Sequence, residues 1–534
     1  MRPKFASLFA GLLVVFATIL GMVPTSVEAA VKRLIFASAG FHESNRFWTI
    51  ARPDHLQFEP YWETLVGMDP KTGDYIPALA TSWKISPDYK TWTFQLRKGV
   101  QFHNGFGEFT SADVKHNHGL LVRKDSTATL GPLWRTATVE TPDKYTAVFV
   151  FKNPTMPTSL FAFSRSGDLR MSSKAQWDKE GIEGLDKNPA GTGPFQFAGR
   201  QTGLNIVYKR NPKHWSGRKI DFEELEFRIA REEATRLALL LSGDVHIGDL
   251  PRELHKDALA KGLKRFQSSL SVDWVSVYLG GQWHITGDKA FDPKGPFVDK
   301  RVRQALNISI NRKELMNTVF AGRAELAYVS LYVPTSEGWN PKWESRFNEL
   351  YAYNPEKAKQ LLKEAGYGPG RPLKFQIWAF TEPGESEGPA IADALAIYFK
   401  RIGVQAEVQI HDWPKIRNAY RKKQSKDFMW PNIIGWRPSD QGIRNFYFSK
   451  GNNHHYEDDF LEKTYSQVLK STDAKQRNQL MMAIGDHLQN EYVDIPLFWF
   501  RNEVFANPKV VADMVYPGPA AGRTSHFELV KLVK

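Results

Sequence analysis

Residues 435–440, "GWRPSD", place an aromatic ring, a guanidinium and a carboxylate close together. They follow an apolar pair, and their glycine and proline are typical of a turn after a strand. Trp436 offers a flat apolar face, Arg437 a cation, and Asp440 a carboxylate that can pair with an amine. The segment is a candidate binding site; the alternative is an ordinary strand end with a solvated charge pair.

Patterns that would indicate catalysis are few. The chain has no cysteine, no G-x-S-x-G, no H-E-x-x-H and no G-x-x-x-x-G-K. "SGRK" (216–219) and "KTG" (71–73) each match a motif of penicillin-recognising enzymes, but their order is reversed and no S-D-N lies between them. We therefore predict no catalytic residue and no enzyme activity. A periplasmic serine hydrolase acting through Ser216 is kept as an alternative from another class.

The histidines lack the spacing of metal ligands. His116 and His118 stand two positions apart on an expected helix, which points them in different directions. His454 and His455 lie in a polar stretch, and no carboxylate–histidine spacing accompanies any of them. We predict no metal site and no cofactor.

The N-terminus has the layout of an export sequence. Arg2 and Lys4 precede an apolar stretch over 5–23, Pro24 ends it, and "VEAA" offers small residues for cleavage after Ala29. A membrane anchor is the alternative, because the apolar stretch approaches the length that spans a bilayer. We expect residues 1–29 to be a cleaved signal peptide and the mature protein to be periplasmic. The absence of cysteine leaves no disulfide and no residue for lipid attachment.

Length and charge set further limits. A chain of 534 residues exceeds one compact core, so two or more lobes are expected. The formal charge is +13, but cations alternate with acids, as in "REEATR", and no basic arm is present. We predict a solvated, mildly basic surface and no nucleic-acid partner.

Short strands and helices alternate along the chain. In 91–102 the apolar residues occupy every second position, which predicts a strand. Thr110 and Asp113 form the capping box of a helix, and Gly243 ends another, whose apolar residues run from Ala234 to Leu241.

Later segments continue this alternation. Asp299, Asn311 and Asn354 are expected to cap three helices, and 404–410 alternates as a strand. The fold class is α/β with short, mixed sheets.

Eight sequence motifs then show a resemblance that covers about 470 residues. The first two, "P-x-LA-x-SW" and "F-x-LR-x-GV-x-FH-x-G", lie within 61–105. "FTSADV", "GTGPF", "NPKHW", "LLLSGDV", "VRQAL" and "AKQLLKEAGY" follow in order. The chain resembles the family 5 extracellular solute-binding proteins, the dipeptide, oligopeptide and nickel binders of ABC importers.

This resemblance implies a two-lobed clamshell of the periplasmic-binding-protein type with an extra subdomain. Lobe I would comprise 31–58, 188–279 and 495–534, the extra subdomain 59–187, and lobe II 280–494. The chain would cross between lobes near "VYLGGQW" and "VDIPLFW", with Gly280 and Gly281 as a hinge. Such a protein is expected to be a monomer that delivers its solute to the importer's permease subunits.

The resemblance also implies where ligand binds. Peptide-binding relatives carry a carboxylate three residues after a tryptophan; here Ser439 takes that position and Asp440 follows one later. Dipeptide-binding relatives carry an arginine after a "WA" pair; here Trp378 and Ala379 match, but Glu382 and two further glutamates follow.

The expected ligand contacts are therefore Phe41, Trp283, Trp378, Glu382, Trp413, Trp436, Arg437 and Asp440. Each tryptophan has a place in the core as its alternative. Because carboxylates and aromatic faces suit cations and rings, we favour a cationic or neutral ring compound as ligand. A peptide is the alternative.

Overall fold

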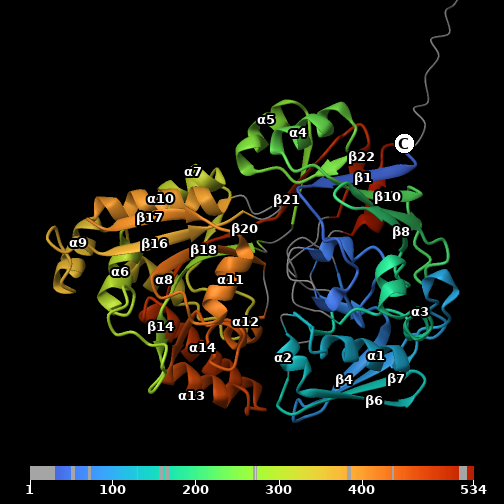
Figure 1. Ribbon diagram of the computed structural model, residues 1–534, viewed down its shortest axis with the longest axis horizontal. Helices are drawn as coiled ribbons and strands as arrows, with labels where there is room; N and C mark the ends of the chain where they lie inside the picture. Colours follow the sequence, from blue (N-terminus) through green and yellow to red (C-terminus); the bar gives the residue numbers. More distant parts are fainter. Residues whose placement is uncertain are drawn as a thin grey trace, which may run out of the picture.

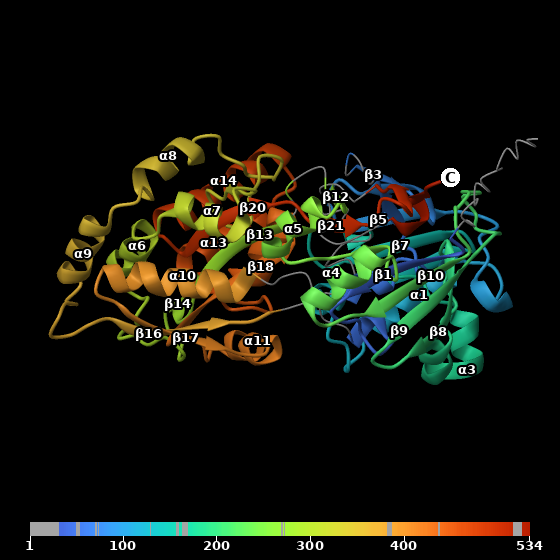
Figure 2. The same ribbon diagram turned by 90° about the horizontal axis from the view of Figure 1, so that it is seen from above.

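The computed structural model describes residues 31–49, 54–69, 72, 74–128, 130–155, 160–162, 169–268, 271, 273–381, 387–435, 438–515 and 526–534. Two lobes lie side by side in both ribbon views (Figures 1 and 2). The first lobe and an extra subdomain form one half, coloured blue to green, with the red C-terminal segment. The second lobe, yellow to red, forms the other half.

The first lobe is built on a seven-stranded mixed sheet. Its order is β12 (Lys264–Gln267), β21 (Glu503–Ala506), β11 (Ile247–Gly248), β1 (Arg33–Ser38), β10 (Glu224–Ile229), β9 (Asn205–Arg210) and β8 (Phe195–Gln201). β1 pairs in parallel with β10 and β11. Helices α4 (Glu233–Ser242) and α5 (His255–Ala260) accompany the sheet, and Gly243 ends α4 at a φ of 87°, as predicted.

The extra subdomain is a four-stranded antiparallel sheet in the order β4 (Ala80–Ile85), β5 (Thr91–Leu96), β7 (Thr146–Phe151), β6 (Ala137–Asp143). Three helices accompany it: α1 (Ser111–Leu121), α2 (Gly131–Trp134) and α3 (Lys174–Lys187). The predicted capping box of Thr110 and Asp113 opens α1, and the predicted apolar face of β5 is buried. Its apolar residues join those of the first lobe in one continuous core.

The second lobe has a six-stranded sheet in the order β15 (Glu325–Leu326), β20 (Asp494–Phe500), β13 (Asp273–Leu279), β18 (Phe428–Gly435), β16 (Lys374–Ala379), β17 (Gln405–Ile410). An aliphatic core on one face contacts α6 (Lys300–Ile308), α7 (Arg312–Phe320), α9 (Pro355–Glu364) and α10 (Glu387–Arg401). An aromatic core on the other contacts α8 (Trp343–Leu350), α11 (Trp413–Arg421), α12 (Ser439–Phe446), α13 (Asp459–Val468) and α14 (Ala474–Asn490). Strand alternation separates the two cores: Val275 and Val277 enter the first, Trp274 and Tyr278 the second.

The strand pairing corrects the predicted crossings between lobes. β13 and β20 belong to the second-lobe sheet, whereas β12 and β21 belong to the first. The chain therefore crosses between β12 and β13 and between β20 and β21, so that 273–279 and 495–500 lie in the second lobe. The rest of the predicted division stays a prediction.

The glycine pair expected as a hinge has a packing role instead. A Cβ on Gly280 would lie 1.7 Å from the Ser425 carbonyl oxygen, and one on Gly281 would lie 2.9 Å from the Lys426 Cα. Gly281 also has a φ of 79°. The pair thus allows close approach of two chain segments within the second lobe.

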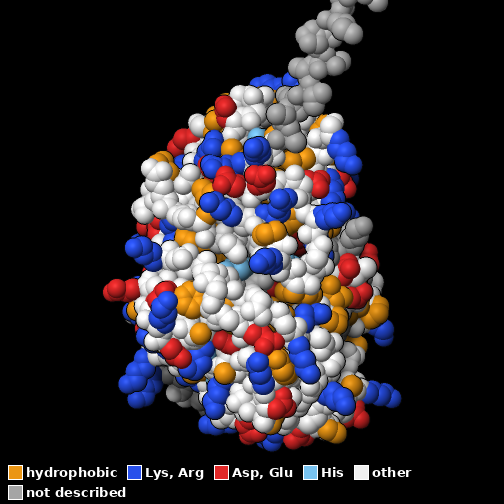
Figure 3. Space-filling view, turned by 90° about the vertical axis from the view of Figure 1, so that its right-hand side faces the viewer, with side chains coloured by type: hydrophobic (Ala, Val, Ile, Leu, Met, Phe, Trp, Pro, Cys, Tyr) orange, Lys and Arg blue, Asp and Glu red, His pale blue; other side chains and the backbone are white. Residues whose placement is uncertain are grey.

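The surface mixes both signs of charge. Figure 3 shows Lys and Arg side chains interspersed with Asp and Glu over the face made by the first lobe and the extra subdomain. Among the described residues, no helix combines the length and apolarity needed to cross a bilayer.

Asp494 gives the second lobe a pH-dependent stability. Burial raises the pKa of this carboxyl from 3.8 to about 7, although the Tyr447 hydroxyl donates a hydrogen bond to its Oδ2. Because the folded protein holds this proton more tightly than the unfolded chain, the stabilisation is complete below about pH 4 and is lost as pH rises through about 7. We expect Asp494→Asn to flatten the loss of unfolding free energy between about pH 4 and 7, measured by urea denaturation. An equal loss in the variant and the wild type would contradict this, and Asp513→Asn, at an exposed carboxyl, is the control.

Candidate ligand site between the lobes

The carboxyl ends of parallel strands in the two sheets face one another. β16, β17, β18 and β20 run parallel and end at one edge of the second-lobe sheet. In the first lobe, β1, β10 and β11 end together in the same way. Arg252, which follows β11, donates from Nε to Glu387 Oε1 at the start of α10 (2.8 Å) and from Nη2 to the Arg501 carbonyl after β20 (3.2 Å). Open α/β sheets bind ligands outside these strand ends, which makes the space between the edges the candidate site.

Phe41 lies at the first-lobe edge of this space. It follows β1, and its ring stacks on Phe227 with 5.1 Å between centroids and 27° between planes. Its side chain is only partly buried. Phe41 therefore retains exposed aromatic surface at the end of a first-lobe strand.

Trp413 lies at the second-lobe edge. It begins α11 shortly after β17, and its ring centroid is 4.7 Å from that of Phe380, which follows β16. The side chain is 8 % exposed. The ends of two parallel strands are thus joined by an aromatic pair.

Trp378 departs from the expected orientation. Its ring stacks on Phe428 at 3.7 Å, and the Lys415 ammonium lies 4.9 Å from its centroid. Its Nε1 donates to Gln376 Oε1 at 2.7 Å. Together with Gln376 and Phe428 it lines a groove along β16 and β17. Phe428 and Lys415 therefore pack against the ring that we expect, from the sequence, to face the other lobe.

Trp283 also differs from its expected role as a ligand contact. It lies on β14 (Gln282–His284), which pairs with β19 (Tyr456–Asp458), and it has no exposed surface. Its Nε1 donates to the His454 carbonyl at 2.9 Å. The indole is a core element of the second lobe, so it does not form a wall of the interlobe space in this structure.

Asp440 is held in a buried ion pair rather than presented to a ligand. Arg477 Nη2 lies 2.9 Å from its Oδ1, and the Tyr465 hydroxyl donates to the same oxygen at 2.9 Å. Burial alone would raise the pKa of this carboxyl, but Arg477 and Arg444 hold it below its usual value. The carboxylate is therefore ionised and already neutralised by the protein.

Three expected contacts, Glu382, Trp436 and Arg437, lie outside the described residues. Glu387, from the same glutamate-rich stretch as Glu382, is described. It pairs with Arg252, and both side chains are less than a tenth exposed. That carboxylate is neutralised by the first lobe.

Reasoning from the sequence did not identify the arginines that organise this region. Arg252, Arg444 and Arg477 lie in ordinary helical or turn segments, and only their partners make them distinctive. Those partners stand 135 residues away for Arg252. An unusually buried cation is visible only once the fold is known.

A serine beside a base fulfils one condition for the hydrolase alternative. Ser216 Oγ lies 2.8 Å from His214 Nδ1, and His214 Nε2 lies 3.2 Å from Glu63 Oε1. However, Trp215 Nε1 donates to both Glu63 oxygens, at 2.8 and 3.1 Å, and Ser216 is exposed in a turn. Nucleophilic catalysis also needs a pocket and an oxyanion site, and none of the described cavities includes Ser216.

No metal centre is found in the described part of the chain, where no three His, Cys, Asp or Glu side chains lie close enough to hold an ion. His103, for example, bonds within the protein, because its Nε2 lies 3.0 Å from the Gly193 carbonyl oxygen. Burial lowers the pKa of His103 to about 4.

Comparison with known proteins identifies the class. The model of the bacterial extracellular solute-binding proteins, family 5, matches residues 74–455. The dipeptide-binding protein of Escherichia coli (strain K12) is 27 % identical over 456 residues, 80 % of each chain. Heme-binding protein A of Haemophilus influenzae is 27 % identical over 411 residues, 72 % of this chain and 70 % of the relative.

A solved structure agrees with the fold. The periplasmic binding protein DppA of Helicobacter pylori, in complex with the peptide STSA, superposes with a TM-score of 0.77 at 22 % identity, covering 95 % of this chain and 99 % of that one. The chain belongs to the family 5 bacterial extracellular solute-binding proteins. These are the substrate-binding components of ABC importers.

Proposed function

We propose that the protein captures a small organic solute between its two lobes and delivers the closed complex to ABC permease subunits. The observation that supports this most is the opposition of the two strand-end edges, joined by Arg252 and Glu387 at 2.8 Å. A ligand held there touches both lobes, so its binding energy favours closure.

The charges of the described residues narrow the ligand class. Both described carboxylates from the expected site are neutralised, Glu387 by Arg252 and Asp440 by Arg477. A cation would find less unpaired negative charge than the sequence suggested, while Phe41 still offers aromatic surface. We therefore favour an uncharged ring compound over a cationic one.

A peptide is the second candidate. Relatives are named as dipeptide-, di/tripeptide- and oligopeptide-binding proteins. A peptide's terminal amine would require a carboxylate other than Asp440, because Arg477 occupies that group.

We further infer that the mature protein is periplasmic, begins near Ala30, carries no lipid and acts as a monomer. The export-type N-terminus supports the location and the mature start, and the absence of cysteine supports the lack of lipid. The monomeric state stays a prediction. We also infer that it is non-catalytic: hydrolysis of p-nitrophenyl acetate that disappears in Ser216→Ala would contradict that inference.

Closure provides the main test. A thermal-shift screen should include uncharged ring compounds and simple dipeptides. We expect an uncharged ring compound to give the largest increase in melting temperature. That ligand should decrease the radius of gyration in small-angle scattering and stabilise the protein by about 2.7 kcal/mol at a hundredfold excess over Kd.

Phe41→Ala should weaken its binding about tenfold, because one aromatic contact is worth about 1 kcal/mol or more. Phe460→Ala, which removes an exposed ring from α13, is the matched control. Saturation without compaction would contradict the clamshell mechanism. Micromolar dipeptide binding would instead favour the second candidate.

A further inference from the structure

A second cavity lies between the extra subdomain and the second lobe. Its volume is about 330 Å³, at the lower end of small-molecule sites. Leu130, Pro132 and Leu133 line it from α2 and the residue before it, while Phe448 and Leu469 line it from the second lobe. Figure 1 shows α2 opposite α12 and α13, at the end of the interlobe space away from β20 and β21.

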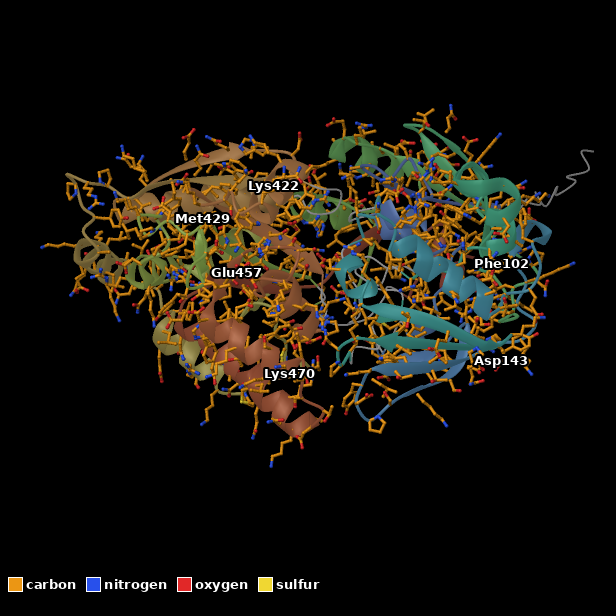
Figure 4. All side chains as sticks on the ribbon, turned by 60° about the horizontal axis from the view of Figure 1, so that its bottom comes forward. Phe102, Asp143, Lys422, Met429, Glu457 and Lys470 are labelled. Carbon is orange, nitrogen blue, oxygen red and sulfur yellow. The ribbon has the colours of Figure 1, made fainter. Side chains whose placement is uncertain are left out.

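Three cations line the second-lobe side: Arg444, Lys450 and Lys470. No aspartate or glutamate is among the residues described as lining the cavity. Figure 4 shows Lys470 on the side of the second lobe that faces the extra subdomain. The cavity therefore combines a cationic wall with apolar ones.

The two nearby acids already have protein partners. Asp440 pairs with Arg477 and also attracts Arg444, while Glu462 accepts from the Ser449 backbone N–H (2.6 Å) and hydroxyl (2.9 Å). Within the described residues, neither Lys450 nor Lys470 forms an ion pair. Arg444 is fixed by its own hydrogen bond, from Nε to the Tyr465 hydroxyl at 3.1 Å.

We propose that this cavity binds an organic anion with an apolar end, such as a medium-chain carboxylate. The carboxylate meets Arg444, Lys450 and Lys470, since charge-assisted hydrogen bonds to cations are the strong ones. The apolar end packs on Leu130 and Leu133. Because the walls come from both halves of the molecule, the bound anion favours the closed arrangement of the lobes. This site is separate from the strand-end site and does not depend on what that site binds.

Octanoate is the probe, with acetate and inorganic phosphate as comparisons, in isothermal titration calorimetry on the full mature chain. Octanoate should bind, and the double variant Lys450→Gln/Lys470→Gln should weaken it at least tenfold. Lys313→Gln/Lys422→Gln removes the same charge from exposed lysines of the same lobe and should leave octanoate binding unchanged. Figure 4 shows Lys422 far from Lys470.

Two further binding measurements test where octanoate binds. Phe41→Ala should not change octanoate binding, because that ring belongs to the strand-end site. Acetate and phosphate should bind at least tenfold more weakly, because they lack the apolar end. Equal octanoate affinity in the wild type and the Lys450/Lys470 variant would overturn the proposal. So would phosphate binding as tight as that of octanoate, or loss of octanoate binding in Phe41→Ala.

Discussion

Replacing Asp440 by alanine should lower the free energy of unfolding by about 3 kcal/mol, because the buried Arg477 loses one of its two carboxylates and keeps only Glu337 at 2.9 Å. Arg477 is 2 % exposed at its side chain and lies 2.9 Å from Asp440. Arg444 also stabilises the ionised form of Asp440. Urea denaturation at about pH 7 measures the change.

Two comparisons make this result specific. Asp513→Ala removes an exposed carboxylate and should change stability by less than about 0.5 kcal/mol. The double variant Asp440→Ala/Arg477→Met should be less destabilised than the sum of the single changes, since it removes both partners. If Asp440 were a ligand anchor instead, the alanine variant would keep its stability and lose only solute binding.

Arg252→Ala should both destabilise the protein and loosen the contact between lobes. Arg252 lies 2.8 Å from Glu387 and 2.7 Å from Glu503, and all three side chains are less than a tenth exposed. Removing the guanidinium from the buried Glu387 is expected to cost about 3 kcal/mol. Glu503 keeps Arg265 and Arg323, at 3.2 and 3.3 Å. Small-angle scattering without ligand should show a larger radius of gyration.

Arg301→Ala is the matched control, because Arg301 is exposed and pairs locally with Asp299 at 2.6 Å. It should change stability by less than about 1 kcal/mol and leave the radius of gyration unchanged. A similar loss in both variants, or no change of shape in Arg252→Ala, would show that Arg252 does not link the lobes.

Local features of the fold could be predicted from the sequence because their causes are local. The caps at Asp299, Asn311 and Asn354 each accept a hydrogen bond from the first turn of the expected helix. The buried face of β5 follows directly from strand alternation.

The candidate site could be predicted less well, because it depends on partners distant in the sequence. Trp283 and Trp378 are aromatic residues near strand ends, yet both contact the protein itself. Trp283 donates a hydrogen bond to a backbone carbonyl, and Trp378 stacks on Phe428. Asp440 stands near the expected position, but Arg477 on α14 neutralises it. No spacing rule predicts a pairing between separate helices.

The position of β21 in the first-lobe sheet has a consequence for folding. β21 lies between β12 and β11, yet it follows the whole second lobe in the sequence. The first-lobe sheet is therefore completed only after almost the entire chain is present. The second lobe is a continuous insertion from 273 to 500, so its sheet can form before β21 is present. Since contacts between distant segments form slowly, we expect the second lobe to fold first and the first lobe last. A chain truncated before β21 should keep a folded second lobe and lack a closed first-lobe sheet.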